Sequence, residues 1–401
     1  MLTGCATAVL PVTTPQPPQV RAPTLAVDTH LHLSMDRAAK PIFRGEPGRG
    51  PLTTNPQNRW VNAIDEAALE AHGVKLVYGA VWPPFAGRPG RTAFDEAVNQ
   101  VRGLELFTLE HPGFAMVHSA AQARRAIARG AIAVLPQLEG GEGLRSVADL
   151  DALYAEGVRC VTLVHFIGND LGGAAAGQLA RALLHQDVRG REKEPQGLTP
   201  LGRDLVTRMM DLGIVIDLAH ASDALAADVL AMTEARGVPV IVSHTGSRAL
   251  SGMERNLPDE LARRVAASGG LIGLSLFVDQ LEVPEHTPHW PGAVPRSCDD
   301  VVGHWLHFAA LVGNDALVLG TDDNGSTVRA GPGGLCPDGV GTSRELGSLW
   351  NALVSKGVPA ESLDSQGERL LGLIERVEKK ALPPAQRGPL VRAPRVDSFP
   401  R

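Results

Sequence analysis

The chain has 401 residues, of which 44% are hydrophobic and 20% are charged, and its formal net charge at pH 7 is −6. This balance is typical of a folded protein with a large core, and the mild acidity without a long basic run argues against a nucleic-acid partner. No apolar stretch reaches about 18 residues, the length that a membrane-spanning helix requires.

The N-terminal sequence MLTGCATAVLPVTTPQPPQV resembles the start of a bacterial lipoprotein. The residues LTGC match a lipobox that ends at Cys5, although the charged region and apolar run that usually precede it are missing. Residues 1–23 are rich in Pro, Thr and Gln, which predicts a flexible tether. A chance match on an unstructured tail is the alternative. Lipidation of Cys5 would place the protein in the periplasm with a lipid anchor; without it we expect a cytoplasmic protein.

Eight short apolar runs follow along the chain. They are dense in Val, Ile and Leu without strict alternation, which is typical of strands buried on both faces. The runs are residues 25–33, 74–82, 131–139, 160–166, 213–220, 238–244, 269–277 and 316–323. Helix-like segments lie between most of them, for example at 59–73, 147–157, 199–213, 222–237 and 258–270. This alternation predicts an α/β fold, a (β/α)8 TIM barrel, with an open doubly wound sheet as the alternative.

The barrel is predicted to span residues 24–378. Residues 379–401 contain too much Pro and Arg to extend it, so they predict a C-terminal tail. Cys298 and Cys336 lie in loop-like sequence, and their disulfide state stays open.

Ionisable side chains close six of the eight predicted strands. A strand repeats every two residues, so His30 and His32 project from the same face of the first one. The others stand at or near the strand ends and are Glu139, His165, His220, His244, Asp322 and Asp323. Each histidine alone is more often a structural residue. Because all these ends meet at one mouth of a barrel, the joint pattern predicts a metal site there.

A cluster of imidazoles and carboxylates suits one or two zinc ions. Glu139 has two oxygens with which to bridge two ions, and bound zinc makes a water molecule nucleophilic near neutral pH. Asp322 is placed to transfer the proton of that water, and His165 to stabilise the developing oxyanion. The residues therefore predict metal-assisted hydrolysis of an amide or a related bond.

Several longer stretches extend the pattern in a specific order. They are VDTHLHL, LEGGEGL, GLTPLGRDLVTRMMDLGIVIDLAHAS, PVIVSHTGSRAL and VVGHWLHFAALVGNDALVLGTDDNG. In this order, from about residue 25 to 325, they resemble the membrane dipeptidase family (renal dipeptidase, peptidase family M19) of the amidohydrolase superfamily. The resemblance implies a TIM barrel and zinc-dependent hydrolysis of dipeptides, and it raises the expectation of a homodimer.

The resemblance also implies a set of metal ligands. His30 would bind one zinc, Glu139 would bridge both, and His220 and His244 would bind the second. One departure concerns His32, because the family normally has Asp at this place. Histidine is a competent zinc ligand, but the exchange removes a negative charge, which predicts a more acidic attacking water or weaker binding of the first metal.

Three further residues would handle the substrate. His165 would contact the scissile carbonyl, Arg255 in ERNLPD would hold the carboxylate of the dipeptide, and Asp322 would carry the proton. Glu142 stands where the family often has His, and Asp323 replaces an aromatic residue. These departures leave open an amidohydrolase of the same fold that acts on an N-acyl amino acid, a lactam or a lactone. A non-catalytic metal-binding lipoprotein is the second alternative.

Overall fold

A computed structural model describes residues 21–33, 66–83, 92–175, 197–276, 280–281, 298–322, 346–388 and 390. Several predictions fall on other residues. The lipobox at Cys5, Asp323 and Cys336 lie outside the described residues, as does the side chain of Cys298.

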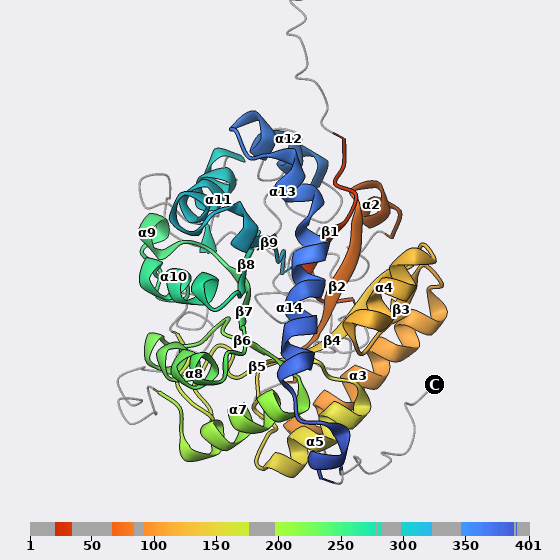
Figure 1. Cartoon of the computed structure of the whole chain (residues 1–401), viewed down its shortest axis with the longest axis vertical. Helices are drawn as coiled ribbons and strands as arrows, with labels where there is room; N and C mark the ends of the chain where they lie inside the picture. Colours follow the sequence, from red (N-terminus) through yellow and green to blue (C-terminus); the bar gives the residue numbers. More distant parts are fainter. Residues whose placement is uncertain are drawn as a thin grey trace, which may run out of the picture.

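The strands form one parallel sheet that curls into a barrel (Figure 1). They are β1 (Ala26–Leu31), β2 (Val74–Val81), β3 (Phe114–Met116), β4 (Ile132–Glu139), β5 (Cys160–Thr162), β6 (Val215–Asp217), β7 (Ile241–Thr245), β8 (Leu271–Leu274) and β9 (Leu317–Leu319). Neighbours follow the order β1-β2-β4-β5-β6-β7-β8-β9. The eight predicted strands and the TIM-barrel fold are thereby confirmed, with shorter strands than the apolar runs suggested.

The sequence did not predict β3. It pairs with the first half of β4, from Ile132 to Val134, on the side where the second half of β4 pairs with β5. A strand of three residues is too short to be recognised as an apolar run. The strand conformation of β3 is therefore set by its pairing with β4.

Helices surround the barrel and bury its strands. They are α2 (Glu66–Ala71), α3 (Ala93–Glu110), α4 (Ala120–Ala128), α5 (Val147–Glu156), α7 (Pro200–Leu212), α8 (Asp223–Arg236), α9 (Arg248–Ser251), α10 (Asp259–Ala267), α11 (Cys298–Val312), α12 (Leu346–Ser355), α13 (Ala360–Asp364) and α14 (Gln366–Lys380). Every residue of β1 and β4 is buried, as expected for strands covered on both faces.

Local sequence determines where several of these helices begin and end. Thr199 caps α7 by accepting a hydrogen bond from the N–H of Gly202, and Pro200 occupies its first turn. Gly213 ends α7 with a left-handed φ of 77°, a conformation that glycine adopts without strain. The predicted helix over 199–213 therefore has the expected ends.

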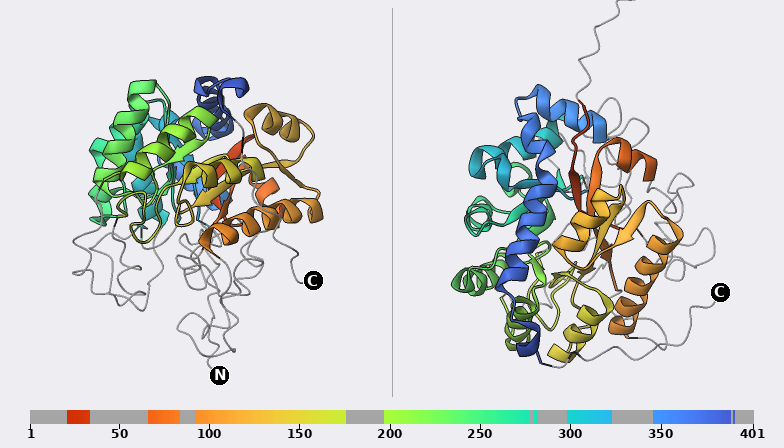
Figure 2. Two further views of the ribbon diagram at one scale, coloured as in Figure 1. Left: turned by 90° about the horizontal axis from the view of Figure 1, so that it is seen from below. Right: turned by 45° about the vertical axis from the view of Figure 1, so that its right-hand side comes forward.

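Helix α14 covers the end of the barrel where the strands begin (Figures 1 and 2). The N–H of Gly367 donates to the carbonyl of Leu25, just before β1, at 2.9 Å. Further along the helix, Arg376 Nη2 donates to the carbonyl of Gly269, just before β8, at 2.7 Å. The opposite end of the barrel, where the strands finish, carries the polar residues.

Both edges of the predicted barrel region make contacts. Pro23 is buried, and Arg21 pairs with Asp364 at 3.0 Å. Beyond α14, the N–H of Leu382 donates to the carbonyl of Asp211 at 2.9 Å.

Among the described residues, none of the helices combines the length and the apolar character that crossing a membrane requires.

Candidate metal centre

The predicted site residues meet at the mouth formed by the strand ends. His30 and His32 come from the end of β1, Glu139 is the last residue of β4, and His244 belongs to β7. His165, His220 and Asp322 stand a few residues beyond β5, β6 and β9. His220 and Asp322 have left-handed φ values of 64° and 59°, which are unusual for residues other than glycine. Such strain is often found at functional sites.

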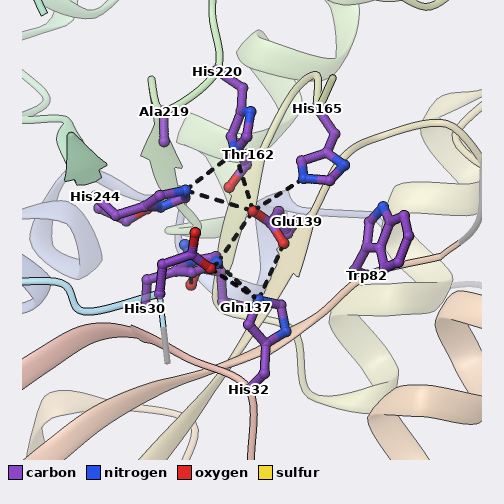
Figure 3. A network of polar contacts seen from close by, with 12 residues as sticks. His30, His32, Trp82, Gln137, Glu139, Thr162, His165, Ala219, His220 and His244 are labelled. Atoms are coloured by element: carbon purple, nitrogen blue, oxygen red, sulfur yellow. Dashed lines mark hydrogen bonds and ion pairs between the residues drawn. The ribbon is translucent and has the colours of Figure 1, made fainter. Parts of the chain in front are cut away.

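Glu139 lies at the centre of the cluster, with both carboxylate oxygens facing histidine nitrogens (Figure 3). Oε1 lies 3.2 Å from His30 Nε2, 3.2 Å from His220 Nε2 and 3.6 Å from His244 Nε2. Oε2 lies 3.4 Å from His32 Nε2. All five side chains are buried. The carboxylate thus has the surroundings of a ligand that bridges two cations.

The histidine nitrogens also approach one another in pairs. His30 Nε2 lies 3.2 Å from His32 Nε2, and His220 Nε2 lies 3.1 Å from His244 Nε2. Two ligands of one tetrahedral zinc are about 3.3 Å apart, because each zinc–nitrogen distance is about 2.0–2.1 Å. The spacing therefore fits a metal ion at each pair.

Within the part of the chain that the structure describes, three groups of potential ligands satisfy the geometry of a metal site. The first is His30, His32 and Glu139, the second is Glu139, His220 and His244, and the third is His30, His244 and Asp322. In each group the ligand atoms lie within 4.8 Å of one another. Glu139 is shared by the first two groups, and its role as a bridging ligand stays a prediction.

His30 and His32, at the end of β1, interact with carboxylates that raise their pKa values. Burial lowers the pKa of His32, but hydrogen bonds to Asp322 and Glu139 outweigh burial and raise the pKa to about 9. For His30, the charge of Glu139 likewise outweighs burial and raises the pKa. Burial would raise the pKa of Glu139, but the facing His30 and His165 hold it well below its usual range. The surroundings of His30 and His32 therefore favour protonated imidazoles when no cation is bound.

The other histidines favour the neutral form. Burial and then the positive charge of Arg255 hold the pKa of His220 well below its usual range. Burial, His30 and Arg255 do the same for His244, and burial lowers the pKa of His165 to about 4. Neutral imidazole is the form that binds a metal, so burial and Arg255 favour the metal-binding charge state of His220 and His244 near neutral pH.

Arg255 is buried, with an exposed fraction of 8%, instead of being a solvated surface charge. Its Nε donates to His220 Nδ1 at 3.1 Å, and its Nη2 donates to His244 Nε2 at 2.8 Å. The guanidinium therefore lies against two of the predicted ligands. Its predicted contact with a substrate carboxylate stays a prediction.

His165 lies beside the metal-ligand cluster. Its Nε2 is 3.5 Å from Glu139 Oε1, and its ring packs against Phe166 and Trp82 at centroid distances of 3.9 and 5.4 Å. Trp82 follows β2 and was not singled out in the sequence. This position is compatible with contact to a substrate bound at the mouth.

A layer of buried polar side chains lies beneath the ligands and was not predicted from the sequence. Gln137, Thr162, Asp217 and Ser243 are all buried within strands β4 to β7. Gln137 Oε1 lies 2.9 Å from His30 Nδ1, and its Nε2 donates to Asp217 at 3.0 Å. A polar residue inside an otherwise apolar run was the available signal, because such a group is buried only when it is hydrogen-bonded.

A parallel barrel with five imidazoles around one carboxylate at its mouth defines the class of metal-dependent hydrolases. The profile of the family described as membrane dipeptidase (Peptidase family M19) matches residues 18–379. The chain belongs to this family, and the predicted resemblance is confirmed. Family membership implies a metal in the site.

Relatives support the same assignment. An uncharacterized dipeptidase of Schizosaccharomyces pombe is 30% identical over 247 residues, which are 60% of this chain and 52% of that protein. The chain thus matches about half the length of this curated relative.

Solved structures share the fold. The dipeptidase AC, a metallopeptidase of family M19, has a TM-score of 0.68 at 21% identity, covering 89% of this chain and 99% of its own. A metallopeptidase from Rhodobacter sphaeroides, liganded with a phosphinate mimic of L-Ala-D-Ala, has a TM-score of 0.66 at 20% identity and covers 88% and 99%. The probable dipeptidase PvdM from Pseudomonas aeruginosa has a TM-score of 0.66 at 20% identity and covers 89% and 96%.

Proposed function

We propose that the protein is a zinc-dependent dipeptidase with two zinc ions at the mouth of its barrel. The position of Glu139 between two pairs of histidines is the observation that carries this proposal. His30 and His32 would hold one ion together with Glu139, and His220 and His244 would hold the other. Imidazole nitrogens and a carboxylate in this number suit zinc.

The proposed reaction adds one water molecule across the amide bond. Bound zinc supplies positive charge that polarises the scissile carbonyl and lowers the pKa of water. Asp322 Oδ1 lies 3.9 Å from His30 Nε2 and 3.7 Å from His32 Nε2, so its carboxylate borders the place where water would attack. Asp322 would take a proton from this water and give it to the leaving amine, which releases a carboxylate and a free amine.

Two cationic or donor groups would position the substrate. His165 would donate an N–H to the carbonyl oxygen as negative charge develops on it. Arg255 would hold the free carboxylate of the dipeptide with two parallel hydrogen bonds. This role requires Arg255 to exchange its hydrogen bonds to His220 and His244 for the substrate.

The test is hydrolysis of a panel of L,L- and L,D-dipeptides by the zinc-loaded protein. The L,D-series is included because the Rhodobacter sphaeroides neighbour is liganded with a mimic of L-Ala-D-Ala. Turnover that depends on zinc supports the proposal. A zinc-loaded protein that cleaves no dipeptide contradicts it, and N-acyl amino acids, lactams and lactones are then the next substrates to examine. A protein that binds no zinc contradicts the metal centre itself.

Location and assembly are separate proposals. We propose a lipid anchor at Cys5 and a homodimer. Mass spectrometry of the protein from its native host tests the first, and an unmodified Cys5 would contradict it. Light scattering of the protein in solution tests the second, with the mass of a single chain as the contrary result.

A further inference from the structure

Asp217 is a buried carboxylate beneath the metal centre, and the proposed reaction gives it no role. It is the last residue of β6, and its exposed fraction is 1%. Five donors surround it. Its Oδ2 accepts from Thr162 Oγ1 at 2.6 Å, Ser243 Oγ at 2.6 Å and Gln137 Nε2 at 3.0 Å, and its Oδ1 accepts from the N–H groups of Ser243 and Ala219 at 2.8 and 3.0 Å.

One branch of this network leads to His30. An ionised carboxylate only accepts hydrogen bonds, so the NH2 group of Gln137 must face Asp217. The amide oxygen of Gln137 then faces His30 Nδ1, at 2.9 Å. Because this oxygen only accepts, His30 Nδ1 must carry a proton. In neutral His30 the lone pair therefore remains on Nε2, the nitrogen that faces Glu139.

A second branch leads to His244. Ser243 Oγ has a single proton, and it is directed to Asp217. The same oxygen lies 2.9 Å from His244 Nδ1, so it must accept a hydrogen bond from the protonated Nδ1. His244 Nε2 thus keeps its lone pair. Arg255 supports this independently, because its permanently protonated Nη2 lies 2.8 Å from His244 Nε2 and needs an acceptor there.

We propose that Asp217 is a positioning residue that sets the Nε2-binding tautomer of His30 and His244 together. This inference rests on the proposed function of the two histidines as zinc ligands. One carboxylate would thereby organise ligands for both ions, through Gln137 on one side and Ser243 on the other. Partners of this kind hold the ring of a ligand and increase its basicity. His220 differs, because its Nδ1 accepts from Arg255 instead.

The test uses Asp217→Asn, which keeps the shape of the side chain but adds two donors. The amide can donate to Ser243 or to a reversed Gln137, so both tautomers lose their determinant. We expect zinc affinity to fall by about 10–100-fold, as measured by competition with a chromophoric chelator. In the metal-free protein labelled with 15N-histidine, at a pH high enough to leave His30 neutral, the NMR signals of His30 and His244 should change from the pure Nδ1–H tautomer toward a mixture of both tautomers.

Two single-branch variants separate the paths. Ser243→Ala should change the tautomer of His244 and leave that of His30, whereas Gln137→Leu should do the reverse. Each should lower zinc affinity, and neither should add much to the loss in Asp217→Asn, because they act through the same residue. Asp151→Asn is the matched control. Asp151 is also buried, but it pairs with Arg208 on α7 at 2.7 Å, so zinc affinity and tautomers should not change.

The outcomes distinguish this inference from the proposed function. A folded Asp217→Asn protein with unchanged zinc affinity and unchanged tautomers overturns the role of Asp217, whatever the substrate. If this variant does not fold, Ser243→Ala and Gln137→Leu decide, and unchanged tautomers in both overturn the proposal. If the wild-type protein binds no zinc, the proposed metal function fails, while the tautomers of the metal-free protein still test what Asp217 determines.

Discussion

The backbone N–H of Asp322 donates a hydrogen bond of 3.0 Å to the carbonyl oxygen of His30. The preceding residue, Thr321, donates its N–H and its hydroxyl to the carboxylate of Asp28 at 2.9 and 2.6 Å. These bonds join the end of β9 to β1. The residue that we propose for proton transfer is therefore held by the strand that carries two of the proposed metal ligands.

Replacing Asp322 by Asn is expected to lower kcat by about 10²–10⁴-fold, because the amide cannot accept the proton of the attacking water. Asn tolerates the left-handed backbone at this position. All five of the proposed zinc ligands are retained in this variant, so the zinc content should stay unchanged. Steady-state kinetics with atomic absorption measure both quantities. Asp315→Asn, at a side chain that is 94% exposed, is the control and should retain full activity. A kcat within tenfold of wild type would exclude Asp322 as the proton carrier.

Zinc binding at pH 7 is expected to release a proton from His32, because its pKa of about 9 keeps it protonated in the metal-free protein. The pKa of His32 is raised from its ordinary value of 6.5, so protonation of His32 stabilises the folded protein. This stabilisation is complete below pH 6.5 and is lost as the pH rises through about 9. His32→Asn should release about one proton fewer per ion bound. Calorimetry in buffers of different ionisation enthalpy measures the number, and equal release by both proteins would refute the prediction.

Glu142 predicts a loss of stability with rising pH. Both of its carboxylate oxygens are buried, and burial raises the pKa of the group to about 8. The folded protein therefore retains a proton that the unfolded chain has lost, and the free energy of unfolding falls between pH 4.5 and 8, by at most about 1.4 kcal/mol per pH unit.

The variant that tests this effect is Glu142→Gln, which does not titrate. Relative to wild type, we expect its free energy of unfolding to increase as the pH rises from 5 to 8. Urea denaturation of the metal-free proteins at several pH values measures the difference. The exposed Glu361→Gln is the control and should show no such trend. A constant difference between Glu142→Gln and wild type would show that Glu142 is not the group responsible.

Gly320 is expected to tolerate no side chain. A Cβ atom there would lie 1.8 Å from the carbonyl oxygen of Ser243 and 2.8 Å from Thr29 Oγ1, inside the barrel. Gly320→Ala should therefore lower the free energy of unfolding by about 1–3 kcal/mol or more. Gly303→Ala on α11 is the matched comparison, because its Cβ would meet no atom within 4 Å. This substitution should raise the free energy of unfolding by at most about 1 kcal/mol. Equal effects in urea denaturation would contradict the packing argument.

Much of the architecture could be predicted from the sequence. Apolar runs dense in branched residues predicted all eight strands of the barrel path, and cap residues such as Thr199 and Gly213 marked the ends of helices. The positions of His30, Glu139 and His244 at strand ends followed from the same patterns. The three-residue strand β3 could not be predicted, because it is too short to show a periodic pattern of apolar residues.

The tertiary structure decided which of these residues act on one another. Glu139 reaches histidines from three other strands only because the barrel closes, and Gln137 meets Asp217 across 80 residues of chain. The burial of Arg255 and the left-handed backbone of Asp322 likewise depend on neighbours distant in sequence. Sequence periodicity records which face of its own strand a side chain occupies. Contacts between distant residues depend instead on the register and closure of the whole sheet, which no local pattern contains.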